Sequence, residues 1–146
     1  MKRINEGDYV RVKYMWGNER IARVEKVLDK DPCYYNMRMY RIDEAVQHSN
    51  AHYLSTKIYD EDIVAHSPKI SNLIKLGDYV NGQKIIKITK DPFIKGQIDL
   101  WTGRTIPFDN DFQQERFIEE DIEDVLTKEQ IEEERYVVNR WKNIKI

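Results

Sequence analysis

The feature that most constrains the fold of this chain is a seven-residue pattern that occurs twice. Ile4-x-x-Gly7-Asp8-Tyr9-Val10 returns as Ile74-x-x-Gly77-Asp78-Tyr79-Val80. If a whole structural unit has been duplicated, further matches should follow in the same order, with changes of length confined to loops.

Two later pairs of segments keep that order. "VEKVLDKDP" (24–32) aligns with "KIIKITKDP" (84–92), and "IYDEDIVAHSPKI" (58–70) aligns with "FIEEDIEDVLTKE" (117–129). The spacing between the copies changes first where "MWGNER" in the first copy stands in place of the shorter "NG" in the second, which is a change at a loop tip. We therefore predict an internal repeat.

Each copy has the pattern of five short strands that follow a Gly-Asp turn. "YVRVKYM" alternates apolar and polar residues, and "RIARVEKVL", "NMRMYRI" and "GQIDLWTG" are rich in strand-forming residues. "TKIYDEDIVAHS" (56–67) and "ERFIEEDIEDVLT" (115–127) each predict a short strand, a tight turn and a closing strand. Asn81-Gly82 is typical of a type I′ hairpin turn, because both central residues need positive φ.

This pattern predicts a mainly β fold made of two tandem small SH3-like β-barrels with short helical segments, since closure hides strand edges. The first unit spans 1–67 and the second spans 68–146, with "HSPKISNL" (66–73) as the link. Thr127 with Gln130 predicts a capping box at the start of a helix over about 128–135, followed by a strand "RYVVNRW". "DEAVQHSNAHY" (43–53) predicts a short helix or long loop without a counterpart of matching length in the second unit.

Composition excludes several classes of protein. The single Cys33 rules out an intramolecular disulfide and favours a reduced compartment, so we expect a cytoplasmic protein. No apolar run approaches the length of a membrane span, and "MKRINEGDYV" lacks the apolar region of a signal peptide, so we expect no membrane partner. A net charge of −2 gives no overall attraction to nucleic acid.

A basic and aromatic region in the first unit is one candidate binding site. Residues 1–41 hold ten Lys or Arg against six Asp or Glu. Three alternatives stay open for its rings and cations: they belong to the core, they line a peptide-binding groove, or they bind nucleic acid. The candidate residues are Tyr14, Trp16, Arg20, Tyr34, Tyr35, Arg38, Tyr40 and Arg41.

An acidic segment is the second candidate. Residues 115–134 hold ten acidic and two basic residues. Such a run is ordinarily a solvated face, and the sharper alternative is a surface that mimics DNA or binds Arg in a partner's basic groove. The candidate residues are Glu119, Glu120, Asp121, Glu123 and Asp124.

No pattern indicates catalysis, a cofactor or a metal. Gly7-Asp8 and Gly77-Asp78 are best interpreted as turns in which Asp caps the backbone. His48 and His52 would share a helix face but lack a third ligand, and His66 lies far along the chain. We therefore expect no enzyme activity, no cofactor and no metal.

One stretch resembles a known group of proteins. "IVAHSPKISNLIKLGDYVNGQKIIKI" (63–88) and "IEEDIEDVLTKEQIEEERYVV" (118–138) resemble a family of uncharacterised proteins of phages and prophages of low-GC Gram-positive bacteria. The residues that carry the resemblance are His66, Ser67, Asn72, Leu73, Ile74, Gly77, Asp78, Tyr79, Val80, Asn81, Gly82, Asp121, Ile122, Thr127, Glu129 and Gln130. The resemblance implies a mobile-element context and carries no reaction with it.

These observations lead to one functional hypothesis and one alternative. The hypothesis is a non-enzymatic, phage-type viral protein that acts by protein binding, with inhibition of a bacterial defence system as one proposed role. The alternative is a nucleic-acid-binding accessory protein that uses the basic and aromatic first unit.

Overall fold

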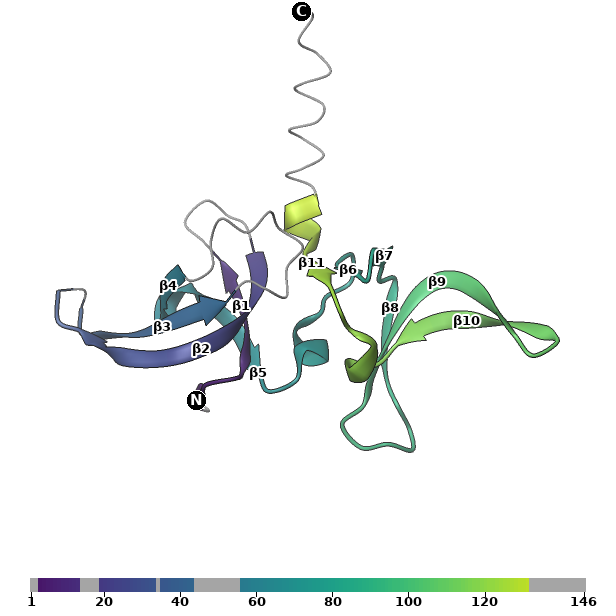
Figure 1. The fold of residues 1–146 in the computed structure, drawn as a ribbon, viewed down its shortest axis with the longest axis horizontal. Coiled ribbons are helices and arrows are strands. Elements are labelled where there is room, and N and C mark those ends of the chain that lie inside the picture. The colour runs from purple at the N-terminus through teal and green to yellow at the C-terminus, as the bar shows by residue number, and fades with distance from the viewer. Residues whose placement is uncertain (1–2, 14–18, 34, 44–55, 132–146) are drawn as a thin grey trace, which may run out of the picture.

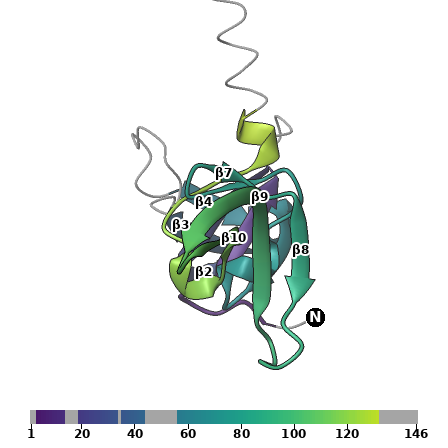
Figure 2. The same ribbon diagram turned by 90° about the vertical axis from the view of Figure 1, so that its right-hand side faces the viewer.

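The computed structural model describes residues 3–13, 19–33, 35–43 and 56–131. These residues form a mainly β structure with several antiparallel sheets and one helix. Figure 1 shows two long hairpins, β2–β3 and β9–β10, that point away from the middle of the molecule in opposite directions, and Figure 2 looks along the second of them.

The first unit is a five-stranded antiparallel sheet with the strand order β4-β3-β2-β1-β5. The chain passes through four neighbouring strands, reverses in the 3-10 turn η1, and returns as β5 to pair with β1. Its elements are β1 (Tyr9–Lys13), β2 (Glu19–Asp31), β3 (Met37–Asp43), β4 (Thr56–Tyr59), η1 (Asp60–Asp62) and β5 (Ile63–Ser67).

The second unit follows the same path in two sheets, with the orders β10-β9-β8 and β11-β6-β7. Only residues 85–86 separate β7 from β8, so together the two sheets repeat the strand order of the first unit. Its elements are η2 (Ile70–Leu73), β6 (Tyr79–Val80), β7 (Gln83–Lys84), β8 (Lys87–Lys90), β9 (Ile98–Phe108), β10 (Asp111–Phe117), η3 (Glu119–Asp121) and β11 (Val125–Leu126), followed by a helix that begins at residue 128.

The repeated Gly-Asp pairs form the same turn in both copies. Gly7 and Gly77 have φ of +88° and +94°, a region that favours glycine. The carboxylates of Asp8 and Asp78 each accept a hydrogen bond from the backbone N–H three residues earlier, at 2.9 Å and 2.7 Å. The turns η1 and η3 also match, because their last residues, Asp62 and Asp121, accept from the N–H three residues earlier at 2.9 Å and 3.0 Å.

The hydrogen bonds shift one part of the sequence alignment by a single residue. The alignment sets Val24 beside Lys84. In the structure Gly7 N–H donates to Val24 O and Gly77 N–H donates to Ile85 O, so Ile85 is the counterpart of Val24. Irregularities in the pairing of β2 with β3 absorb the difference, since a bulge inserts an extra residue without disturbing the rest of the ladder.

The expectation about residues 43–53 was wrong in one respect. Arg41 of β3 lies opposite Lys57 of β4, and Trp101 of β9 lies opposite Arg116 of β10. Arg41 and Trp101 therefore occupy equivalent positions, and so do Lys57 and Arg116. Fifteen residues separate Arg41 from Lys57 and fourteen separate Trp101 from Arg116, so the second unit does have a segment of similar length. It folds as the outer part of the β9–β10 hairpin, whereas residues 44–55 lie outside the described residues.

Two local predictions are confirmed. Asn81 and Gly82 have φ of +51° and +79° and connect β6 to β7, as a type I′ turn requires. Thr127 and Gln130 form the capping box: the Thr127 N–H donates to Gln130 Oε1 at 2.9 Å, and the Gln130 N–H donates to Thr127 Oγ1 at 3.2 Å. The predicted strand after the helix lies outside the described residues.

Barrel closure is not confirmed. Among the described residues, none of the sheets closes on itself, and β4 and β5 remain the edges of the first sheet. β4 pairs with β3 and β5 pairs with β1, with no pairing between the two edges in the described residues, and the two long hairpins point outward from the middle of the molecule (Figure 1).

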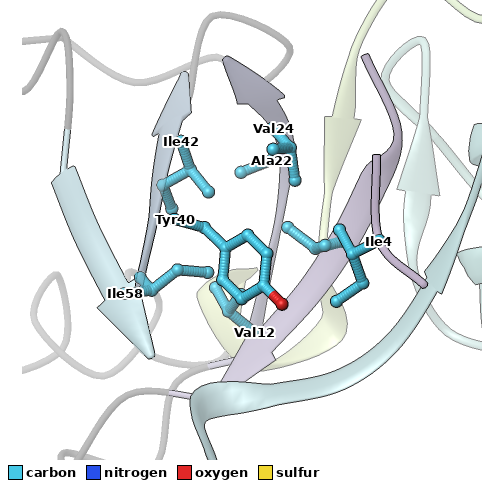
Figure 3. Close-up of a cluster of buried hydrophobic side chains, with 8 residues drawn as sticks. Ile4, Val12, Ala22, Val24, Tyr40, Ile42 and Ile58 are labelled. Atoms are coloured by element: carbon cyan, nitrogen blue, oxygen red, sulfur yellow. The ribbon is translucent and has the colours of Figure 1, made fainter. Parts of the chain in front are cut away.

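Each unit has its own apolar centre. In the first, Tyr40, Ile42 and Ile58 meet residues of β1, β2 and the N-terminal segment (Figure 3). In the second, Val80, Ile85 and Leu100 form the centre, and Ile21 of β2 in the first unit is buried in the same cluster. The expected link is part of this second core, because Ile70 and Leu73 of η2 are buried in it.

The units are joined through the opposite face of the first sheet, where Arg11 of β1 lies between Ile21 of β2 and Ala65 of β5. Side chains alternate along a strand, so Val10 and Val12 enter the first core and Arg11 points to the second unit. Arg11 Nη1 donates to Asp78 Oδ2 at 2.6 Å, and Nη2 donates to Asp78 Oδ1 at 3.3 Å. Arg11 is 1% exposed and Asp78 is 0% exposed.

Further groups contact this buried pair. Arg11 Nη1 also donates to Leu73 O at 3.0 Å, and Nη2 lies 3.2 Å from Glu129 Oε2 and 3.6 Å from Glu19 Oε2. Burial by itself lowers the pKa of Arg11, but the hydrogen bond and charge of Asp78, with the charges of the two glutamates, outweigh it and raise that pKa above its ordinary value. The guanidinium therefore stays charged inside the junction.

Substitution of the two repeated aspartates should have unequal effects. Asp78→Ala leaves a buried guanidinium without its main partner and should cost about 3–5 kcal/mol of unfolding free energy. Asp8→Ala removes a turn hydrogen bond and should cost about 1 kcal/mol. Urea denaturation of both variants measures the difference, and equal losses would show that the junction is not the main contribution of Asp78.

Candidate binding surfaces

The residues of the predicted basic and aromatic site do not form one surface. Tyr14, Trp16 and Tyr34 lie outside the described residues. Arg20 is half-buried on β2, opposite Val12. Tyr35 is 89% exposed at the end of the β2–β3 hairpin, while Arg38, Tyr40 and Arg41 follow along β3.

Tyr40 belongs to the core, which is the first of the three alternatives left open for it. Its ring lies among Ile42, Ile58 and Val12 (Figure 3), and it is 3% exposed. Its hydroxyl donates to Asp60 Oδ1 at 2.7 Å. Burial and this hydrogen bond raise the pKa of Tyr40 to about 12.

Arg41 lies on the opposite face of the sheet, at the centre of a row of cations. It is directly opposite Lys26 of β2 and Lys57 of β4. Lys26 and Lys57 are exposed and Arg41 is half-buried. Sequence reasoning named only Arg41, because the row becomes visible only when the register of three strands is known.

The equivalent row of the second unit has a different centre. Trp101 lies opposite Lys87 and Arg116. Both cations sit over its ring, 5.9 Å and 5.8 Å from the centroid, and the indole N–H donates to Thr89 Oγ1 at 2.8 Å. Arg116 also donates to Asp99 Oδ2 at 3.1 Å, so its charge has a carboxylate partner.

The acidic candidates divide into structural and exposed residues. Glu119 accepts hydrogen bonds from the backbone N–H groups of Ile70 and Ser71 at 2.8 Å and 2.7 Å, so it holds the first turn of η2. Asp121 caps η3, and Asp124 is half-buried beside β11. Glu120 and Glu123 are exposed. The run is therefore partly internal structure, which leaves fewer charges for a partner.

The outer part of the β9–β10 hairpin carries two exposed aromatic rings that the sequence did not suggest. β8 pairs with β9 only over 98–101, so beyond this point the hairpin has two strands. Phe108 and Phe112, near its end, are 60% and 72% exposed. Phe112 lies opposite Pro107 and Phe108 lies opposite Asp111, so each face of the hairpin presents one ring.

A hollow of about 300 Å³ lies beside the second Gly-Asp turn. Its lining is mostly apolar with two lysines: Leu76, Gly77, Tyr79, Lys84, Ile85, Ile86, Lys128 and Ile131. Within the described ranges, no group of three or more His, Cys, Asp or Glu side chains is placed to hold a metal ion. His48 and His52 lie outside those ranges, and His66 of β5 lies opposite Val10 of β1.

No helix in the described part of the chain is long and apolar enough to cross a membrane. No protein-family model, curated protein or solved structure matches this chain.

The raised pKa of Tyr40 predicts a loss of stability at alkaline pH. Because its folded pKa of about 12 exceeds the ordinary 10.0, the neutral phenol stabilises the fold fully below pH 10 and this contribution disappears as pH rises towards 12. In Tyr40→Phe the contribution is absent at every pH. The stability difference between wild type and variant, measured by urea unfolding, should shrink across this range, and a constant difference would contradict the assignment.

The acidic segment provides a matched pair of variants. Glu119→Ala removes the acceptor of two backbone N–H groups and should cost about 1–3 kcal/mol. Glu120→Ala alters an exposed neighbour and should stay within about 0.5 kcal/mol of wild type. Thermal or urea unfolding measures both, and a neutral Glu119→Ala would show that η2 does not depend on this carboxylate.

Proposed function

We propose that this protein is a non-enzymatic binding module of phage or prophage type, built from two SH3-like units, that binds a protein partner in the host cytoplasm. The SH3-like part rests on the strand order, in which a tight turn returns the fifth strand to the first in both units. The phage context rests on the resemblance of residues 63–88 and 118–138, and the cytoplasmic location on the lone Cys33.

The outer part of the β9–β10 hairpin is the observation that carries the proposal. A two-stranded hairpin gains little stability of its own in water. This one nevertheless extends from the second unit and presents Phe108 and Phe112 to solvent. Aromatic side chains are enriched in the buried centres of protein interfaces, where a few of them supply most of the binding energy. A partner that covers the hairpin end would bury both rings.

A binding module without chemistry of its own acts by occupying a surface of its partner. In a mobile-element context, a host defence protein is a partner whose occupation would benefit the phage. We therefore propose inhibition of a bacterial defence system as the role of this contact. The basic row of the first unit belongs to a different surface and favours a second kind of ligand.

The double variant Phe108→Ser/Phe112→Ser tests the protein-binding surface. A partner captured from a low-GC Gram-positive host lysate would be purified, and its Kd measured against wild type and variant. Each ring that is lost should weaken binding by about 2 kcal/mol, or about 30-fold.

Tyr35→Ser is the matched control, because it removes an exposed aromatic residue from a hairpin end of the other unit. Unfolding curves of all variants should agree closely with wild type. Capture that is insensitive to the double variant, or equally sensitive to Tyr35→Ser, would contradict the assignment.

A further inference from the structure

The row formed by Lys26, Arg41 and Lys57 is unfavourable in the free protein. Residues directly opposite each other in neighbouring strands have Cβ atoms about 5 Å apart, and like charges at that separation destabilise a sheet. Here Arg41 has a like charge on both sides. Within the described residues, no ion pair and no hydrogen bond to a carboxylate reaches any of the three.

The row faces away from the first core. Tyr40 and Ile42, the neighbours of Arg41 along β3, are buried, and so is Ile58 beside Lys57. Because alternate residues of a strand point to opposite faces, Arg41 and Lys57 point to the outer face. β4 is the edge of this sheet. The cations therefore form an open strip across three strands.

The equivalent row of the second unit has no cation at its centre. There Trp101 separates the two cations, and Asp99 pairs with Arg116. In the first unit Arg41 replaces the tryptophan, and Met39 stands where the second unit has Asp99. The same backbone thus carries a compensated row in one unit and an uncompensated row in the other.

An aromatic ring lies beside the uncompensated row on the same face. Tyr59 is two residues from Lys57 along β4 and lies opposite Met39. Its hydroxyl donates to Asp31 Oδ2 of β2 at 2.9 Å. Since β3 separates β4 from β2, the Tyr59 side chain crosses β3, and this bond holds its ring on the sheet surface beside the cations.

We propose that the outer face of β2–β3–β4 binds single-stranded nucleic acid, with Lys26, Arg41 and Lys57 on the phosphates and Tyr59 as a stacking surface for a base. Repeated phosphates complement a strip of equal charges, and the ligand relieves the repulsion between them. Lysine contacts phosphate as a point charge and arginine through its planar fork, and neither contact depends on base identity. The site goes beyond protein binding and uses a separate surface.

Binding of labelled oligo-dT and oligo-U to the full chain, measured by fluorescence anisotropy at several salt concentrations, tests this. Three phosphate contacts predict a log–log salt slope of about −2, because each contributes about −0.7. Lys26→Ala and Lys57→Ala should each make the slope shallower by about 0.7. Tyr59→Ala should weaken binding by about 5- to 150-fold, whereas Tyr59→Phe, which keeps a ring, should bind more tightly than Tyr59→Ala.

Lys87→Ala is the matched control, because Lys87 holds the position of Lys26 in the second unit. It should leave the slope and affinity unchanged, as should Phe108→Ser/Phe112→Ser, which separates this site from the protein-binding surface. Removal of Lys26 or Lys57 should not lower the unfolding free energy, since it relieves repulsion. The proposal is overturned if no oligonucleotide binds at low salt, if Lys87→Ala has the same effect as Lys57→Ala, or if poly-glutamate binds through the row and oligonucleotides do not.

Discussion

The pair formed by Arg11 and Asp78 is the interaction on which the rest of the structure depends. It joins the first strand of one unit to the Gly-Asp turn of the other, and both side chains are removed from water. The Asp78 carboxylate also accepts the N–H groups of Lys75 and Lys128, so a single residue holds the turn, the start of the helix and the neighbouring unit. A buried pair of this kind adds little stability over an apolar contact, but it penalises any arrangement that leaves one partner alone.

The two units keep one backbone plan and differ in how they use it. In the part of the chain that the structure describes, the Asp8 carboxylate bonds only within its own turn, whereas its counterpart Asp78 also bonds Arg11 at the junction. The rows centred on Arg41 and Trp101 differ in the same way: one leaves its charges unbalanced, and the other balances them with a ring and a carboxylate. The projecting aromatic hairpin belongs to the second unit, so the two candidate surfaces lie on different units.

The features that sequence reasoning predicted are those set by nearby residues. Asn81-Gly82, the Thr127 capping box and the strands around both Gly-Asp turns follow from local backbone preferences. Arg11 could not be found in this way, because its setting between Val10 and Val12 is typical of a strand with one wet face, and the second unit that covers this face is distant in sequence. The row of cations required the register of three strands, including a bulge that shifts the alignment by one residue. Glu119 was interpreted as part of an acidic surface, because the sequence does not show that the backbone of η2 lies beside it.

Pro107 has a consequence for how the projecting hairpin meets other molecules. A strand tolerates proline where its missing N–H would have faced solvent, so the gap falls on the open margin of β9. A foreign strand laid along that margin would find an interrupted row of donors and could not complete a regular ladder. The hairpin therefore resists the pairing of two copies along this margin. Phe108 and Phe112 remain accessible to a partner through their side chains.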